Sequence, residues 1–75
     1  MYYVYILKSI FSPKKIYIGF SSNLQSRFAQ HNRGESDYTS RFLPWKLIYY
    51  ESYFPSKDAQ NRERQLKRFA KAWDN

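Results

Sequence analysis

Apolar positions crowd two short runs near the start of the chain. Residues 2–9 (YYVYILKS) are apolar on both alternations, which is typical of a strand that is covered on both faces. Residues 16–20 (IYIGF) form a second β-rich run, and residues 11–15 between them supply a turn around Pro13. The two runs therefore predict a β-hairpin.

Two later segments have the period of an α-helix. Residues 24–33 (LQSRFAQHNR) follow a stretch of capping residues at 21–23 and precede Gly34, which suits the position after a helix end. Residues 56–73 predict a long helix with Ser56 as its cap, on which Ala59, Leu66, Phe69, Ala70 and Trp73 form the buried stripe.

A third strand separates the two helices. Residues 45–54 (WKLIYYESYF) are rich in aromatic and β-branched side chains, and Pro55 ends the run. Residues 34–42 are polar and turn-like. The order ββαβα predicts an α+β fold, a three-stranded antiparallel sheet flanked by helices, and we expect residues 1–75 to form a single domain.

Composition narrows the classes of function. At 75 residues the chain is near the lower limit for a single core, and its sixteen aromatic side chains (eight Tyr, six Phe, two Trp) compensate by burying large areas. With no cysteine and one histidine, a Cys-type zinc site and a His-cluster metal site are excluded. The net charge of +7 favours an anionic partner, most simply nucleic acid. Without a signal peptide or long apolar run, we expect a cytoplasmic protein that does not bind membranes.

Arg27 and His31 lie four residues apart on one flank of the apolar stripe made by Leu24 and Phe28. They are therefore expected where the helix meets the sheet, in a partly sheltered groove. Two interpretations stay open. Arg27 can extend its head to water while His31 bonds a carbonyl, or the pair can form one wall of a phosphate site.

Glu63 lies at the edge of the buried stripe of the last helix, where a carboxylate needs a partner. One partner is Lys67, one turn further on, in the favourable order for a helix ion pair. The other is a divalent cation that keeps most of its waters until a substrate phosphate completes the shell. The spacing leaves both open.

Tyr5 and Tyr17 are expected on one surface if the hairpin pairs odd with odd positions. We expect both hydroxyls to be exposed there, with Arg27, His31 and Glu63 converging on the same groove. Gly19 beside them leaves the backbone bare, as close approach by another group requires. Paired tyrosines are also common in sheets, and strand glycines often mark bulges.

The chain contains four motifs in order, which are YVYIL, YIG at 17–19, LQSRFAQHNRG at 24–34 and AQNRERQLK at 59–67. In these motifs it resembles the GIY-YIG nuclease superfamily and its short single-domain bacterial members. The resemblance aligns the following residues with the family's tyrosines, glycine, arginine, histidine and metal-binding glutamate: Tyr5, Tyr17, Gly19, Arg27, His31 and Glu63. The first half-motif lacks its glycine. A further asparagine of nuclease members cannot be placed, and truncation of the domain at its C-terminus is one explanation.

The resemblance implies metal-dependent hydrolysis of phosphodiester bonds in DNA, with Glu63 holding one Mg²⁺ or Mn²⁺. Arg27 would bind phosphate oxygens, and a tyrosine with His31 nearby would activate water. Affinity should come from contacts of basic side chains with backbone phosphates, namely those of Arg41, Lys57, Arg62, Arg64, Lys67, Arg68 and Lys71. Two rival functions are a nucleic-acid-binding module that cuts poorly and an interaction domain whose aromatic surface binds protein.

Overall fold

A computed structural model of the chain describes the backbone of residues 1–73 and the side chains of residues 1–71. Its elements follow the predicted order, with one short 3₁₀ helix in the polar stretch. They are β1 (Tyr2–Ser9), β2 (Ile16–Ser21), α1 (Leu24–Asn32), η1 (Thr39–Phe42), β3 (Trp45–Tyr53) and α2 (Ser56–Trp73). The predicted α+β fold is confirmed, and no helix of the described chain is long and apolar enough to cross a membrane.

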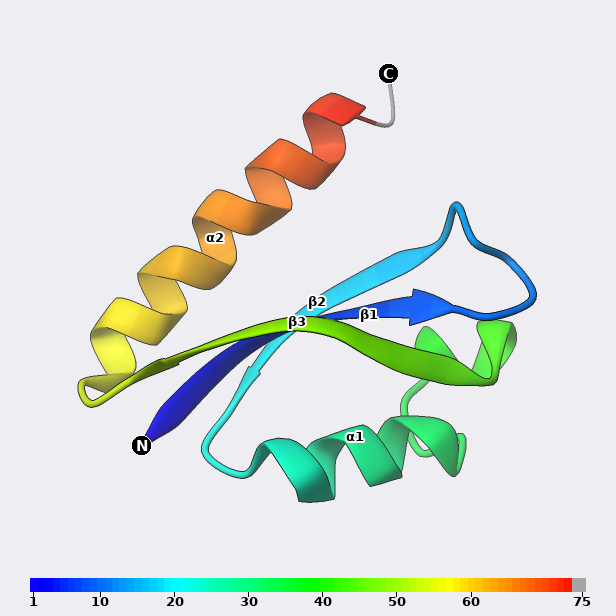
Figure 1. Ribbon diagram of the computed structural model, residues 1–75, viewed down its shortest axis with the longest axis horizontal. Coiled ribbons are helices and arrows are strands. Elements are labelled where there is room, and N and C mark those ends of the chain that lie inside the picture. The colour runs from blue at the N-terminus through cyan, green and yellow to red at the C-terminus, as the bar shows by residue number, and fades with distance from the viewer. Residues whose placement is uncertain (74–75) are drawn as a thin grey trace.

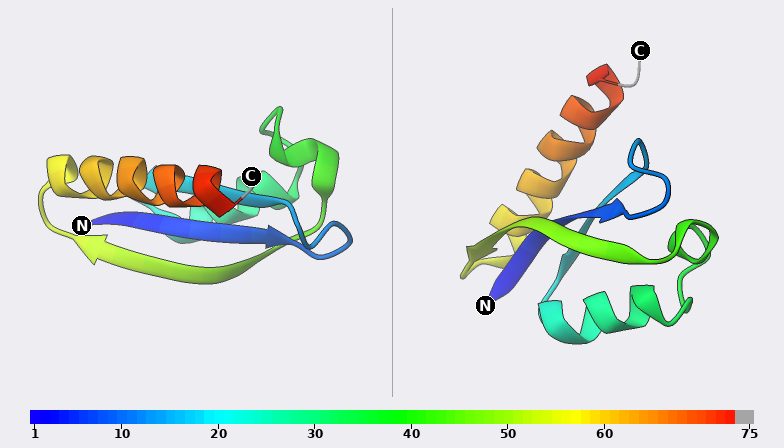
Figure 2. Two further views of the ribbon diagram at one scale, coloured as in Figure 1. Left: turned by 90° about the horizontal axis from the view of Figure 1, so that it is seen from above. Right: turned by 45° about the vertical axis from the view of Figure 1, so that its right-hand side comes forward.

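The three strands form one antiparallel sheet in the order β2-β1-β3, so β1 is central. Figure 1 shows the two helices on opposite faces, with α2 above the sheet and α1 below it. β3 is the strand nearest the viewer and β2 is the farthest, as the view from above in Figure 2 makes clear. Both helices contact the edge strand β2.

The central strand contributes to two cores, one on each face. Val4 packs with Ile18 and with Ala59 of α2, while Tyr5 and Leu7 belong to a second buried cluster. That second cluster also holds Trp45 and is covered by side chains from α1, namely Leu24 and Phe28. The double apolar alternation of residues 2–9 is thus explained by burial on both sides.

Polar contacts fix the position of α1. Its N-cap is Asn23, whose side chain accepts a hydrogen bond from the Ser26 amide, and Gly34 beyond its end has a φ of 77°. The Asn32 amide group bonds the backbone of Trp45 twice, donating to its carbonyl at 3.0 Å and accepting from its N–H at 2.7 Å. These two bonds tie the end of α1 to the start of β3.

The predicted buried stripe of α2 is wrong at Phe69, which is 58% exposed. Ala59 is buried, and Leu66 and Ala70 pack on the same core. At about 100° per residue, Phe69 lies about 80° from Ala59 around the helix, beyond the reach of the sheet. The predicted burial of Trp73 concerns a side chain outside the described residues.

Candidate functional site

Tyr5 and Tyr17 lie on the α1 face of the sheet, as the odd-with-odd register predicts. Tyr5 is opposite Gly19 and Leu7 is opposite Tyr17, so the two tyrosines are diagonal neighbours on adjacent strands. Their ring centroids are 6.2 Å apart. The shared surface expected from the sequence is therefore present.

Gly19 makes room for these two rings. A Cβ atom at this position would lie 2.5 Å from the Tyr5 hydroxyl oxygen and 2.8 Å from Cε2 of Tyr17. Both distances are shorter than a van der Waals contact allows. The space beside Gly19 is thus filled by the ring of Tyr5, which corrects the expectation that the glycine leaves the backbone bare for a substrate. Its role is to let Tyr5 lie flat across β2.

His31 is fully buried and holds the Tyr5 hydroxyl. Its Nε2 atom is 3.0 Å from the hydroxyl of Tyr5, and its Nδ1 atom is 2.8 Å from the hydroxyl of Thr39. Tyr17 covers the imidazole, with ring centroids 4.7 Å apart. Burial, and next the charge of Arg27, lower the pKa of His31 to about 4, so the ring is neutral at pH 7. His31 therefore lies behind the tyrosines, not on the wall of a groove. Its hydrogen-bond partners are two hydroxyls, not the carbonyl that one interpretation of the sequence expected.

Tyr5 is also fully buried, so the expected exposure of its hydroxyl is wrong. Burial raises the pKa of Tyr5 to about 12, Tyr17 and Glu63 add to this rise, and Arg27 opposes it. The hydroxyl therefore keeps its proton at neutral pH and can serve as a hydrogen-bond donor. Tyr17, which is half-buried, is the member of the pair that reaches the surface.

Arg27 of α1 carries a positive charge that acts on the same hydroxyl. Its side chain is half-buried, and its Nη1 atom donates a hydrogen bond to Oε1 of Gln30 at 3.0 Å. Its positive charge acts on both Tyr5 and His31, favouring the ionised phenol and the neutral imidazole. Arg27 is thus the cation of this cluster.

Glu63 lies on α2, which covers the other face of the sheet. Its negative charge contributes to the raised pKa of Tyr5, and its side chain is 22% exposed. Lys67 lies one turn further along, with its Nζ atom 3.7 Å from Oε2 of Glu63, so the ion-pair alternative is observed. Among the described residues no group of three or more His, Cys, Asp or Glu side chains could hold a metal. A metal held at this place has one carboxylate ligand from the described chain.

Two residues of the site were not predicted from the sequence. Thr39 is fully buried, and besides its bond to His31 its carbonyl accepts a hydrogen bond from Trp45 Nε1 at 2.7 Å. Tyr38 beside it places its ring centroid 6.1 Å from that of Tyr17. Both lie at the start of η1 in the polar stretch 34–42, where no periodic pattern marks the inward positions.

The predicted phosphate-binding residues divide into two groups. Arg62 forms a bidentate ion pair with Glu51 on β3, at 2.9 Å from Nε to Oε1 and 3.1 Å from Nη2 to Oε2. The hydroxyls of Tyr49 and Tyr53 also donate to Glu51, and these bonds, led by that of Arg62, lower the pKa of Glu51 to about 2. The placement of Arg62 therefore favours a structural role.

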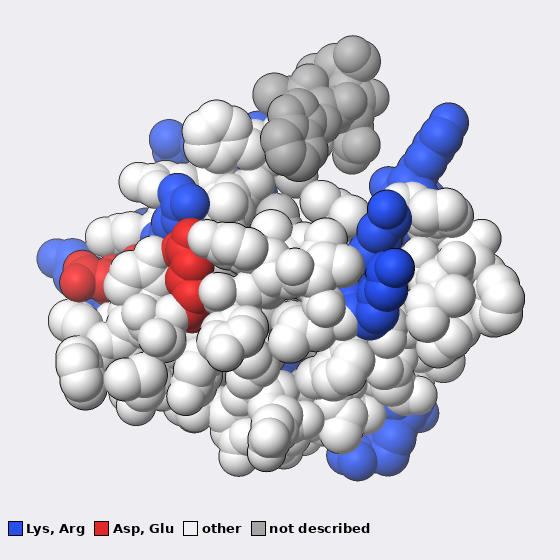
Figure 3. All heavy atoms as spheres, in the orientation of Figure 1, with Lys and Arg blue, Asp and Glu red and all other residues white. Residues whose placement is uncertain are grey.

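The remaining residues of that prediction are exposed at the surface: Arg41, Lys57, Arg64, Lys67, Arg68 and Lys71. On the face shown in Figure 3 the acidic side chains gather on the left, where β3 meets α2, and the other charged side chains are basic. The exposed charge is therefore predominantly positive, as a polyanionic partner requires.

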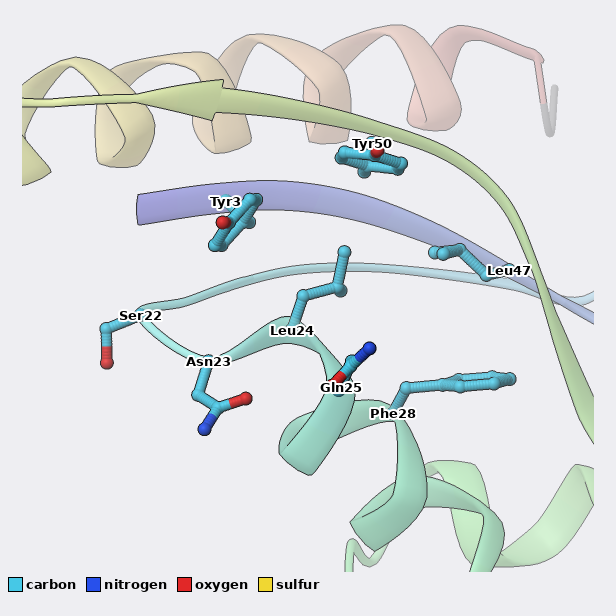
Figure 4. Close-up of a pocket in the computed structure, with 8 residues that line it drawn as sticks. All are labelled: Tyr3, Ser22, Asn23, Leu24, Gln25, Phe28, Leu47 and Tyr50. Carbon is cyan, nitrogen blue, oxygen red and sulfur yellow. The ribbon is translucent and has the colours of Figure 1, made fainter. Parts of the chain in front are cut away.

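A separate cavity of about 440 Å³ lies on the α1 face, near the start of that helix. Figure 4 shows Tyr3 and Tyr50 from the strands facing Leu24 and Phe28, whereas Ser22 and Asn23 point away. It contains none of the residues predicted for the site.

Comparison with known proteins shows the family of this chain. The family model described as the GIY-YIG catalytic domain matches residues 1–74. The chain belongs to the GIY-YIG nuclease superfamily.

The chain is also similar to individual members. A UPF0213 protein of Clostridium perfringens is 38% identical over 72 residues, which are 95% of this chain and 75% of the relative. A UPF0213 protein of Staphylococcus haemolyticus is 34% identical, over 93% of this chain and 84% of the relative. A structure-specific endonuclease subunit SLX1 homolog of Giardia intestinalis is 40% identical over 73% of this chain, but only 16% of that longer protein is covered. No solved structure gives a significant match.

Proposed function

We propose that the chain is a metal-dependent endonuclease that hydrolyses phosphodiester bonds in DNA. The observation that carries this proposal is the cluster of Tyr5, Tyr17 and His31, in which the Tyr5 hydroxyl lies 3.0 Å from Nε2 of His31 and the ring of Tyr17 covers the imidazole. The charges of Arg27 on α1 and Glu63 on α2 act in opposite directions on the pKa of Tyr5. A cation and a carboxylate near such a cluster suit a reaction centre that handles a phosphate.

The donor set fits a hard divalent cation. Glu63 offers carboxylate oxygens, the ligands that Mg²⁺ and Mn²⁺ prefer, and its side chain remains partly exposed. A single protein carboxylate is sufficient where phosphate oxygens and water supply the other ligands. When bound, the ion would lower the pKa of water and neutralise charge that develops on the phosphate.

The other roles in the reaction belong to side chains of this protein. Arg27 binds non-bridging phosphate oxygens through its guanidinium. Tyr17, at the surface, is positioned to orient the attacking water, whereas Tyr5 is fully buried, keeps its proton and supports the ring of Tyr17 from within the cluster. His31 is a positioning residue, because it holds the Tyr5 hydroxyl from behind and has no exposed surface.

Nicking of supercoiled plasmid by wild type and by Glu63→Gln tests the proposal. The substitution keeps the shape of the side chain but removes the charge that holds the metal, so cleavage should fall by orders of magnitude. Glu35→Gln is the matched control, because Glu35 pairs with Arg33 in an exposed turn. Melting temperature is measured on the same samples. Cleavage by a folded Glu63→Gln protein at the wild-type rate would remove Glu63 from the metal role.

A second candidate is a nucleic-acid-binding module with little cleavage. The ion pair between Lys67 and Glu63 favours it, because the lysine already neutralises the carboxylate. Salt-sensitive binding of DNA without nicking, in Mg²⁺ and in Mn²⁺, would support this function over the nuclease.

A further inference from the structure

A groove of about 490 Å³ runs along the outer side of β2, next to the candidate site. We name it the β2-edge groove. Its floor is made by apolar side chains of the edge strand and of α2, Ile16, Ile18 and Ala70. Its other lining residues are two tyrosines, Tyr17 and Tyr38, and two lysines of α2, Lys67 and Lys71. In the left view of Figure 2, the green segment between α1 and β3 lies on the β2 side of the sheet, away from β3.

Tyr38 is held in place but is only partly covered. Its ring centroid is 5.5 Å from that of Phe42, 6.1 Å from that of Tyr17 and 6.4 Å from that of Trp45. The residue is nevertheless 42% exposed. Three aromatic neighbours hold the ring, and its exposed part can accept a flat apolar group. Such a preorganised ring is a stacking platform.

The two lysines supply the complementary charge. Lys67 and Lys71 are one helical turn apart on α2 and line the same groove as Tyr38. The combination of an aromatic platform with a row of cations is the recognition mode of single-stranded nucleic acid, in which a base stacks and the phosphates are neutralised. A base in a duplex presents no free face to such a ring.

We propose that the β2-edge groove binds an unpaired nucleotide of the strand that is cut, with its base on Tyr38 and its phosphates on Lys67 and Lys71. This inference rests on the proposed function, because Tyr17 belongs to both the groove and the candidate site. A nucleotide in the groove therefore presents its neighbouring phosphate to the site. The substrate class that follows is nucleic acid with a single-stranded segment beside the scissile bond.

Binding is measured by titration of a labelled single-stranded oligodeoxynucleotide and of a blunt duplex of the same sequence. EDTA is present throughout, so cleavage plays no part. We expect tighter binding of the single strand. Tyr38→Ala should weaken it about 5- to 150-fold, the range for loss of one stacked base, and should leave duplex binding unchanged. Tyr38→Phe should restore most of the affinity, because stacking needs the ring and not the hydroxyl.

Three controls sharpen the result. Tyr50→Ala removes another exposed tyrosine, on β3 at the opposite edge, and should leave the affinity unchanged. Lys71→Ala should make the slope of log K against log salt shallower by about 0.7 for the single strand. An oligonucleotide that lacks the base at the position bound by Tyr38 should bind wild type more weakly. Tyr38→Ala should then cause no further loss of affinity for that oligonucleotide.

Equal affinity for the single strand and the duplex, or an unchanged single-strand affinity in folded Tyr38→Ala, would overturn the inference. The failure of the proposed function looks different. Loss of nicking activity with intact, Tyr38-dependent single-strand binding would contradict the nuclease and leave the groove in place. Glu63-dependent nicking by a protein insensitive to Tyr38→Ala would do the reverse.

Discussion

The hydroxyl of Tyr5 in β1 and the Nε2 atom of His31 in α1 lie 3.0 Å apart, and both residues are fully buried. The imidazole is held from its other side by the Thr39 hydroxyl at 2.8 Å. This chain of three side chains locks the ring of Tyr5 beside Gly19. It also keeps the imidazole away from solvent, which is the physical origin of its lowered pKa.

The buried imidazole makes the stability of the fold depend on pH. The pKa of His31 is lowered from 6.5 to about 4, first by burial and then by Arg27. Between these values the unfolded chain binds a proton that the folded chain does not, so stability falls as the pH drops through this window. The contribution is fully present above about pH 6.5, and roughly 2–3 kcal/mol of unfolding free energy is lost toward pH 4.

Urea denaturation at about pH 7.5 and pH 5 measures this change. His31→Gln is the control, because it removes the only histidine of the chain and should flatten the pH dependence in that interval. Glu51, with its pKa lowered to about 2, affects stability only at lower pH. An unaltered pH dependence in His31→Gln would contradict the assignment.

Gly19→Ala should destabilise the domain, because the added Cβ would collide with the Tyr5 hydroxyl and with Tyr17. Overpacking of this kind costs about 1–3 kcal/mol. A double-mutant cycle with Tyr5→Leu, followed by thermal denaturation, measures the coupling. Gly34→Ala is the matched control, since its cost comes from a φ of 77° and should be independent of Tyr5. Additive effects of Gly19→Ala and Tyr5→Leu would show that the collision is not what matters.

Arg62→Ala should affect stability, whereas Arg64→Ala should affect DNA binding. Arg62 holds Glu51 through two hydrogen bonds, so its loss should lower Tm and leave Glu51 with the hydroxyls of Tyr49 and Tyr53 as partners. Arg64 is exposed, and its loss should leave Tm unchanged while making the salt slope of duplex binding shallower by about 0.9. Thermal melts and salt titrations on both variants decide the matter. The distinction fails if Arg62→Ala melts like wild type.

Lys67→Met should strengthen binding of divalent metal in the absence of nucleic acid. The Lys67 ammonium, 3.7 Å from Glu63, competes with any cation for that carboxylate. An exposed ion pair of this kind is worth a factor of about 1.5 to 5 in affinity. Calorimetric titration of the protein with Mn²⁺ measures it, and Lys57→Met, in the first turn of α2, is the control. A weaker Mn²⁺ affinity in Lys67→Met would place the metal elsewhere.

The sequence by itself determined the elements of the fold, because they follow from local patterns. The double alternation in residues 2–9 predicted a strand covered on both faces, and Asn23 and Gly34 fixed the ends of α1 through short-range hydrogen bonding and φ. Parity along the hairpin placed Tyr5 and Tyr17 on one face on the condition that odd positions pair with odd positions, and the register of β1 with β2 meets that condition. The order of the four motifs identified the family.

Only the tertiary structure decided how deeply each site residue is buried and which partner each charge has. His31 is enclosed because Thr39 and Tyr17 arrive from other parts of the chain. Likewise Arg62 meets Glu51 eleven positions earlier, on the adjacent strand.

The two flanks of α2 also show what the sequence determines and what only the tertiary structure determines. At about 100° per residue, Glu63 and Arg62 fall on opposite sides of the stripe that contains Ala59, and this much follows from the sequence. Which flank faces β2 depends on how the helix crosses the sheet. That crossing is set by packing of Ala59, Leu66 and Ala70 on the core around Val4 and Ile18, on one face of the sheet, contacts that no local pattern encodes.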